Sequence, residues 1–249
     1  CLVHYNRPNY LAHALASIAA QTYPAIEVVL VDDGSTHPEA LSYLSVLEKE
    51  FKVKNWKLIH QKNRYLGAAR NTAARHASGK FIKYMDDDNI AMPHEIATLV
   101  KVALHTKADI VTCCLRSFEG DAPPADQNAM VTWVPHGVDT TLGIFLNSFG
   151  DANALIKRSV FDQLNGFTEE YGIGHEDWEF FAKAHLQGYR IETIPEPLFY
   201  YRVTPGSMQH NTQASQNHAR NLRPYLAHYP ELATLLRFSQ GLYEKNNQL

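Results

Sequence analysis

The chain has 249 residues, of which 45% are hydrophobic and 20% are charged, and its formal net charge is −3. A chain of this length can form one large domain with a full core, or two small ones. Lysine and arginine are spread along the sequence, which disfavours a nucleic-acid partner, because binding to phosphate backbones usually requires a basic face. No apolar run approaches the ~20 residues that a transmembrane helix needs.

Two of the three cysteines, Cys113 and Cys114, are adjacent within an apolar run. This spacing favours buried thiols over a disulfide framework or a zinc site, and it indicates a reducing compartment. We therefore expect a cytoplasmic location, or one at the inner face of the membrane. The sequence opens within a predicted strand and without a signal peptide, so we expect a piece of a longer polypeptide. Any membrane association is then expected through segments outside this chain.

The first 115 residues alternate between predicted strands and predicted helices. The strands are 2–5, 27–31, 56–60, 80–85 and 110–115, and the helices are 8–21, 38–51, 67–77 and 93–105. This alternation predicts an α/β fold whose mostly parallel central sheet is flanked by helices on both faces.

Residues 116–150 lose this rhythm, and their glycine and proline content predicts a loop or excursion. The remaining predicted elements are segment 152–156, helices 158–164 and 177–186, segment 190–194 and an aromatic strand at 198–202. From residue 211 onward the sequence predicts a helical tail.

Two acidic runs follow predicted strands: Asp32-Asp33 and Asp86-Asp87-Asp88. In an open α/β sheet, ligands bind beyond the carboxyl ends of the strands. Crowded carboxylates need neutralisation, and Mg²⁺ or Mn²⁺ provides it while also binding phosphates. The alternative is that acidic residues simply end strands as solvated turns. For Asp32-Asp33, a solvated turn and a cation site explain the sequence equally well. For three consecutive aspartates, the solvated turn is the weaker explanation.

Two further patterns are less specific. In Gly67-Ala-Ala-Arg70-Asn71, small residues permit close backbone approach, and a helix N-terminus with Arg70 favours an anion; ordinary helix packing is the alternative. In Gly174-His175-Glu176-Asp177, two carboxylates open an aromatic helix, where they could equally serve as an N-terminal cap.

Taken in chain order, these motifs resemble the inverting family-2 glycosyltransferases with a GT-A fold, of the type that builds bacterial cell-surface polysaccharides. The resemblance covers roughly residues 2 to 208 and rests on the following segments: Tyr5-Asn6-Arg7-Pro8, Asp32-Asp33-Gly34-Ser35-Thr36, Gly67-Ala-Ala-Arg70-Asn71, Asp86-Asp87-Asp88-Asn89, Gly174-His-Glu176-Asp177-Trp, and Pro195-Glu-Pro-Leu-Phe-Tyr-Tyr-Arg202. It implies a single Rossmann-like domain of the nucleotide-diphospho-sugar transferase type.

The resemblance also implies roles for individual residues. Asp33 would contact the nucleotide base, on which Tyr5 would stack. The donor site would further include Gly67, Arg70, Asp86, Asp87 and Arg202. Asp88 would be the direct metal ligand, with Asp86 as the second metal-motif carboxylate, directed toward the ribose or sugar. Asp177 would be the general base, and Glu176 would orient the acceptor.

The remaining implications concern a closing segment and one departure from the pattern. Arg202 and Ser207 would lie in a flexible segment that closes over the diphosphate. His4 departs from the family pattern, since many relatives have a small or hydroxylated residue there. His175 and His210 are kept as candidates for phosphate or metal contact.

We therefore expect a Mn²⁺- or Mg²⁺-dependent enzyme that transfers a sugar, with inversion, from a nucleotide-sugar donor to a carbohydrate or lipid-linked acceptor. UDP is the nucleotide that the resemblance favours, and polysaccharide or glycoconjugate synthesis is the expected context. Residues 1–115 would bind the nucleotide sugar, 116–208 would bind the acceptor and carry catalysis, and 209–249 would form the tail.

Two alternatives belong to other classes. A nucleotidyltransferase would carry a glycine-rich phosphate loop after its first strand, but that turn is Tyr5-Asn6-Arg7-Pro8. A non-catalytic sugar-nucleotide-binding module would be expected to have lost the Asp triplet or the Glu-Asp pair, and this chain retains both.

Overall fold

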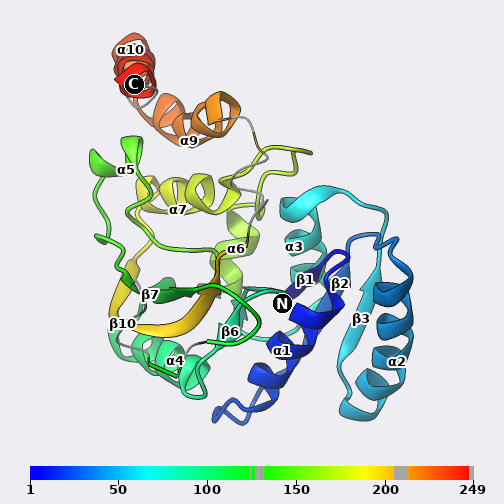
Figure 1. Cartoon of the computed structure of the whole chain (residues 1–249). Helices are drawn as coiled ribbons and strands as arrows, with labels where there is room; N and C mark the ends of the chain where they lie inside the picture. The colour runs from blue at the N-terminus through cyan, green and yellow to red at the C-terminus, as the bar shows by residue number, and fades with distance from the viewer. Residues whose placement is uncertain (124, 127–129, 131, 205–211, 213, 247–249) are drawn as a thin grey trace.

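The computed structural model describes residues 1–123, 125, 126, 130, 132–204, 212 and 214–246. The N-terminal part forms a four-stranded parallel sheet in the order β3-β2-β1-β5 (Figure 1). Its strands are β1 (Leu2–His4), β2 (Val29–Asp32), β3 (Lys57–His60) and β5 (Met85–Asp86). Its helices are α1 (Pro8–Ala19), α2 (Pro38–Lys54) and α3 (Tyr65–His76).

Alternation of side chains along the strands explains how this sheet is covered on both faces. Leu2 and Leu30 point to one face, where they pack against apolar residues of α1 and α2. Val3 and Val31 point to the other face and pack against α3. The predicted parallel sheet with helices on both sides is thus observed.

A second sheet, in the order β4-β9-β7-β10-β6, follows the first, with β8 beside β7. Its strands are β4 (Phe81–Lys83), β6 (Ile90–Ala91), β7 (Ile110–Phe118), β8 (Thr132–Trp133), β9 (Leu155–Lys157) and β10 (Ile191–Arg202). Only β7 and β10 pair in parallel; the other pairs are antiparallel. This mixed sheet was not predicted, because a short apolar strand has the same kind of sequence whether it pairs in parallel or antiparallel.

One predicted strand, 80–85, divides into β4 and β5, and the division joins the two sheets. β4 pairs with β9 of the mixed sheet, whereas β5 pairs with β1 of the parallel sheet. Between them, the Tyr84 amide donates to Ala154 O (3.3 Å) and the Met85 amide to Cys1 O (3.0 Å). The acidic run that begins at Asp86 therefore starts where the two sheets meet.

Strand β10 joins two segments that were predicted separately, 190–194 and 198–202. It runs without a break through Pro195-Glu196-Pro197, which lies between them. Its pairing with β7 shifts register on both sides of Pro197. Proline has no N–H to donate to a ladder, so the chain bulges at this point and then resumes pairing.

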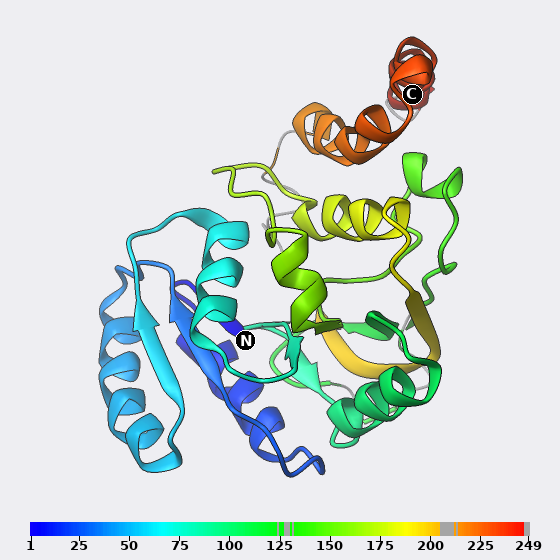
Figure 2. The ribbon, with the colours of Figure 1, turned by 180° about the vertical axis from the view of Figure 1, so that it is seen from behind.

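Helices also cover both faces of the mixed sheet. On one face, α4 (Glu95–Thr106) packs against side chains such as Val111 and Leu155. On the other, α6 (Arg158–Gln163) and α7 (Glu176–Leu186) pack against Ile110 and Ile156 (Figure 2). The region 116–150, predicted as a loop, contains the end of β7, strand β8 and the short helix α5 (Leu142–Phe145).

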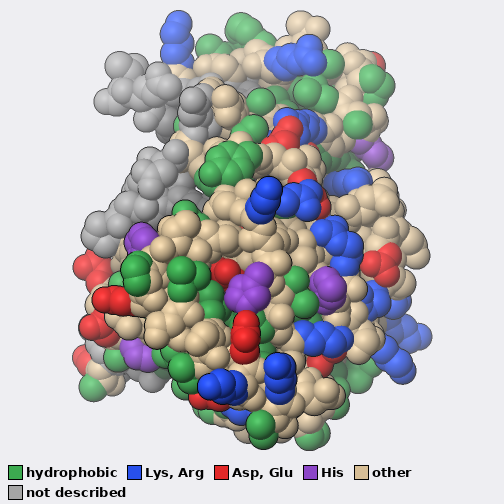
Figure 3. Space-filling model, turned by 90° about the vertical axis from the view of Figure 1, so that its right-hand side faces the viewer, with side chains coloured by type: hydrophobic (Ala, Val, Ile, Leu, Met, Phe, Trp, Pro, Cys, Tyr) green, Lys and Arg blue, Asp and Glu red, His purple; other side chains and the backbone are tan. Residues whose placement is uncertain are grey.

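The C-terminal segment is helical, as predicted, with α9 (Ala214–His228), a 3-10 turn (Pro230–Leu232) and α10 (Ala233–Asn246). Helix α9 packs across α7, and α10 extends beyond it (Figure 1). All three cysteines are free thiols, and Cys113 and Cys114 are buried, as predicted. Acidic and basic side chains are interspersed over the face seen in Figure 3. Within the described residues, no helix is long and apolar enough to span a bilayer.

Candidate active site

A cavity of about 440 Å³ opens at the carboxyl ends of β1 and β2 and reaches between α3 and α7. Six carboxyl groups line it: Asp33, Asp86, Asp88, Asp151, Glu176 and Asp177. Tyr5 and Arg70 also lie on its wall. The fold thus brings together acidic motifs that are far apart in the sequence, at the sheet edge where ligands of α/β proteins bind.

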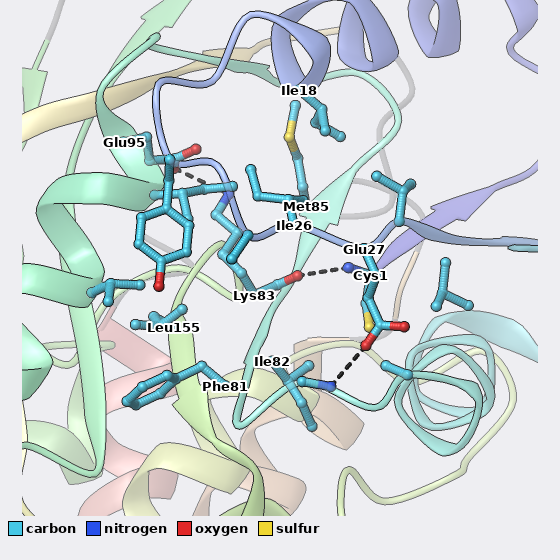
Figure 4. A pocket seen from close by; sticks show the side chains of 18 of the residues that line it. Cys1, Ile18, Ile26, Glu27, Phe81, Ile82, Lys83, Met85, Glu95 and Leu155 are labelled. Carbon is cyan, nitrogen blue, oxygen red and sulfur yellow. Dashed lines mark hydrogen bonds and ion pairs between the residues drawn. The ribbon is translucent and has the colours of Figure 1, made fainter. Parts of the chain in front are cut away.

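A second cavity of about 490 Å³ lies at the amino ends of β1 and β2 (Figure 4). Apolar side chains such as Ile18, Ile26 and Leu155 form much of its wall. Two of its charged groups have partners within the protein: the Cys1 amino group donates to Lys83 O (2.8 Å), and Lys83 Nζ lies 3.1 Å from Glu95. No residue of the acidic motifs lines this second cavity. We therefore place the candidate active site in the 440 Å³ cavity at the carboxyl ends of β1 and β2.

Asp33 lies at one side of the active-site cavity, at the end of β2. Its Oδ1 accepts the Gln61 side chain (2.6 Å) and the Arg64 amide (3.0 Å), and its Oδ2 accepts the Tyr65 amide (2.9 Å). Burial raises the pKa of Asp33, although these donors oppose the shift. Besides facing the pocket, Asp33 therefore fixes the loop that leads into α3, which the sequence did not reveal.

Arg70 links the two acidic motifs. Its Nη2 lies 2.7 Å from Asp86 Oδ1, and its Nη1 lies 2.5 Å from Glu176 Oε1. Burial disfavours the charge of the guanidinium, but the surrounding carboxylates outweigh this effect and raise the pKa of Arg70. Arg70 thus remains a cation at the centre of the site, with its charge shared between a strand-end aspartate and the start of α7.

The middle residue of the aspartate triplet is inaccessible. Asp87 is fully buried and accepts His4 Nδ1 (2.6 Å) and the Arg7 guanidinium. It does not line the pocket, so the expected donor contact of Asp87 has no support from its position. His4, the departure from the family pattern, is one of the two side chains that satisfy this buried carboxylate.

Asp88 lies on the pocket wall, where Arg7 also contacts it. Burial, opposed by Arg7 and reinforced by Asp87 and Asp86, raises the pKa of Asp88 to about 6. Asp86 and Asp88 present hard carboxylate oxygens to the same cavity, a donor chemistry that fits Mg²⁺ or Mn²⁺ completed by phosphate oxygens. Among the described residues, no three metal-ligating side chains form a preassembled cluster.

The Glu-Asp pair opens α7 after His175, whose backbone is left-handed (φ 64°). Glu176 is buried against Arg70, whereas Asp177 faces the cavity and accepts the Trp178 amide with Oδ1 (2.8 Å). Burial raises the pKa of both carboxyl groups. Glu176 is therefore placed to hold Arg70, and Asp177 is the member of the pair that a ligand can reach.

Helix α9 supports this turn from behind. Arg220, which is 1% exposed, donates to Ile173 O (2.9 Å) and Gly174 O (3.0 Å). The Gly174 amide donates to Asn217 Oδ1 (2.9 Å), and Asn221 Nδ2 lies 3.0 Å from His175 Nδ1. The predicted helical tail, 209–249, thus contributes buried side chains that shape the site. Residue 115, where we divided the two functional halves, lies within β7.

Asp151 was not singled out in the sequence, yet it lies in the cavity. Burial, together with the charges of Asp86 and Asp177, raises the pKa of Asp151 to about 7. Tyr201, from β10, lines the same wall. A glycine-aspartate pair just before an apolar segment was the only signal available, and it is too common to mark a site.

Two expected donor residues lie elsewhere. The close approach at Gly67 is to protein rather than to a ligand, because a Cβ there would meet Thr168 O at 2.7 Å. Arg202 does not lie in a flexible segment: it ends β10 and is 2% exposed. Its guanidinium donates to Asp88 O (3.1 Å) and stacks 4.2 Å from the Tyr10 ring centroid. Ser207 and His210 lie outside the described residues.

Comparison with known proteins identifies the class. The family described as "Glycosyl transferase family 2" matches residues 1–164, and "N-terminal domain of galactosyltransferase" matches residues 146–205. The chain therefore belongs to glycosyl transferase family 2 and is a glycosyltransferase of the GT-A type.

Individual relatives agree with this assignment. The putative glycosyltransferase EpsH of Bacillus subtilis is 27% identical over 98% of this chain and 70% of its own length. The glycosyltransferase GlyA of Streptococcus pneumoniae is 30% identical over 82% of this chain but only 30% of its own length.

Solved structures share the fold. TarS of S. aureus in complex with UDP-GlcNAc superposes with a TM-score of 0.70 at 20% identity, covering 91% of this chain and 65% of TarS 1-349. The mannosyltransferase PcManGT of Pyrobaculum calidifontis, in complex with GDP-Man and Mn²⁺, superposes with a TM-score of 0.66 at 22% identity. The match covers 96% of this chain and 67% of PcManGT.

Proposed function

We propose that this glycosyltransferase transfers a sugar from a UDP-sugar to an acceptor hydroxyl with inversion at the anomeric carbon, assisted by Mn²⁺ or Mg²⁺. The observation that carries the proposal is that Asp33, Asp88 and Asp177 line one cavity. A nucleotide-recognising carboxylate, a metal-binding carboxylate and a reachable base are the three groups that such a transfer requires.

The donor would lie with its base toward Asp33 and Tyr5 and its diphosphate toward the aspartate run. Asp33 can accept the imide N–H of uracil, while Tyr5, 44% exposed, offers a ring for stacking. Asp88, with Asp86, would hold the cation, which when bound supplies positive charge to the leaving diphosphate. UDP and UDP-GlcNAc bound to TarS, and GDP-Man with Mn²⁺ bound to PcManGT, support this class of donor.

Asp177 would act as the general base. An acceptor hydroxyl is a weak nucleophile, so its proton must pass to a carboxylate as its oxygen attacks the anomeric carbon. The new carbon–oxygen bond forms as the bond to the diphosphate oxygen breaks, and attack from the opposite face inverts the centre. Burial raises the pKa of Asp177 and thereby makes it a stronger base. Glu176 acts as a positioning residue through Arg70.

The acceptor is proposed to be a carbohydrate or lipid-linked carbohydrate in polysaccharide or glycoconjugate synthesis. A screen with UDP-, GDP- and dTDP-sugars, after EDTA treatment and with Mn²⁺ restored or withheld, tests the proposal. We expect UDP-sugar turnover that requires the cation. Preference for another nucleotide, or equal turnover in EDTA, would contradict the corresponding part of the proposal.

A further inference from the structure

Asp151 and the loop that carries it have no part in the mechanism above, although they lie in the same cavity. The loop, residues 146–154, connects α5 to β9. Asp86 and Asp177 are the acidic groups whose charges act most on Asp151, and Tyr201 lines the same wall. We call Asp86, Asp151 and Asp177 the acidic corner.

The loop is built to hold Asp151 in place. The Asn147 side chain donates to Gly150 O (2.8 Å) and accepts the Phe149 amide (3.2 Å). Gly150 has φ 138°, and a Cβ there would lie 2.6 Å from the Thr112 side chain, so only glycine fits. These contacts fix the backbone immediately before Asp151.

The other side of Asp151 is anchored equally well. Asn153 Nδ2 donates to Glu95 (2.7 Å), and its Oδ1 accepts Lys83 Nζ (2.5 Å). The Asn153 amide donates to Asp151 Oδ1 at 2.8 Å. Asp151 thus projects from a loop that is tied to the protein core at both ends.

Asp151, like Asp177, differs from Asp86, Asp88 and Glu176 in how its charge is balanced. Asp86 and Glu176 pair with Arg70, and Asp88 pairs with Arg7. Within the described residues, no arginine, lysine or histidine forms an ion pair with Asp151. The Asp151 side chain is half-buried and lines the cavity, so a ligand can reach it without displacing a charged partner.

We propose that Asp151 accepts a hydrogen bond from a hydroxyl group of the transferred sugar, and that the acidic corner selects a neutral sugar over an anionic one such as a uronate. This inference rests on the proposed function, since it requires a nucleotide sugar in the cavity. A sugar hydroxyl satisfies the free oxygen of Asp151, whereas a uronate would bring a further negative charge beside three carboxyl groups.

The experiment compares binding of UDP with binding of UDP-sugars, because only the latter reach Asp151. Calorimetric titrations with Mn²⁺ and without acceptor would use UDP, UDP-glucose, UDP-galactose, UDP-GlcNAc and UDP-glucuronate. We expect the tightest neutral donor to bind more tightly than UDP-glucuronate. Asp151→Asn should lower the affinity for that neutral donor roughly 10- to 100-fold and leave the affinity for UDP unchanged. The ratio of the affinity for the neutral donor to the affinity for UDP-glucuronate should therefore become smaller.

Two variants complete the design. Asp151→Ala removes the acceptor oxygen altogether and should weaken the neutral donor at least as much as Asp151→Asn. Asp162→Asn, an exposed aspartate on α6 outside the cavity, should change none of the affinities. Thermal unfolding of each variant verifies that it is folded.

The possible failures are distinguishable. If wild-type protein bound none of the UDP compounds, the proposed function and this inference would both be wrong. If UDP-sugars bound and Asp151→Asn changed UDP and UDP-sugar equally, or changed neither, only the role of Asp151 would be refuted. A wild-type preference for UDP-glucuronate would refute the charge selection.

Discussion

Arg220 Nη1, on helix α9, lies 3.6 Å from Oε2 of Glu176 at the start of α7. Glu176 in turn holds Arg70, which contacts Asp86. Helix α9 is thus connected to Asp86 of the acidic run through a chain of three buried charges, those of Arg220, Glu176 and Arg70. Such a chain is stabilising only while each member keeps its partner, because an isolated buried charge is strongly unfavourable.

Arg220→Met should therefore lower stability by about 3–5 kcal/mol, the usual effect of removing one partner from a buried ion pair. The transfer rate, measured below the unfolding transition, should also fall, because the turn at Gly174 loses two hydrogen bonds. Arg223→Met is the matched control: this exposed arginine on the same helix pairs with Glu170, and its loss should cost less than about 1 kcal/mol. Equal unfolding temperatures for the two variants would contradict the assigned role.

Asp177→Asn should lower the transfer rate by roughly 10²–10⁴-fold, the usual contribution of a general base. Asparagine Oδ1 can still accept the Trp178 amide, so α7 should keep its first turn. UDP affinity should barely change, since the residue acts on the acceptor. Turnover and UDP affinity should be measured on the same variant. If neither falls, Asp177 only caps the helix. If both fall sharply, Asp177 binds the donor and is not the base.

Asp88→Ala should abolish the metal-dependent part of donor turnover while the protein remains folded. In the presence of UDP, Mn²⁺ should raise the melting temperature of the wild-type protein but not that of the variant, because a ligand stabilises only the form that binds it. The exposed Asp162→Ala provides the control for loss of an acidic residue. A variant that kept both near-normal turnover and the Mn²⁺ shift would show that Asp88 is not the ligand.

Asp151→Asn should change how stability depends on pH. The folded-state pKa of about 7 exceeds the ordinary value of 3.8, so the folded protein binds this proton more tightly than the unfolded chain does. The stabilisation is complete below about pH 4 and is lost as pH rises to about 7. The variant does not lose this stabilisation. The difference between its melting temperature and that of the wild type should therefore shift in favour of the variant as the pH rises from 5 to 8, by roughly 2–4 °C for each kcal/mol of stabilisation that the wild type loses. Parallel pH profiles would refute the assigned shift.

The sequence predicted the positions of those candidate site residues that lie at the ends of strands. Asp33 and Asp86 could be placed because an apolar run followed by carboxylates marks the edge of a parallel sheet, and the resemblance supplied Asp177. Asp151 and Arg220 could not be found in this way. Each owes its place to tertiary packing, one on a loop between α5 and β9 and the other on a helix that crosses α7.

Partners were also invisible in the sequence. Position 87 belongs to an acidic motif, yet only the structure shows that His4 and Arg7 satisfy its carboxylate away from the cavity. Arg202 follows an aromatic run typical of the family, but its guanidinium is occupied by backbone carbonyl groups, including that of Asp88. Charged residues can be located from a motif, whereas the groups that neutralise them depend on the folded chain.

The division of residues 81–86 between two sheets restricts how the enzyme can move. β4 is bonded to the mixed sheet and β5 to the parallel sheet, with Tyr84 between them. Cys1, which precedes β1, donates its amino group to O of Lys83 in β4 (2.8 Å), so rotating one sheet against the other would break this bond. The chain is thus bonded to the mixed sheet at Tyr84 and to the parallel sheet at Met85, so movement of either sheet would displace Asp86 and the carboxylates that follow it.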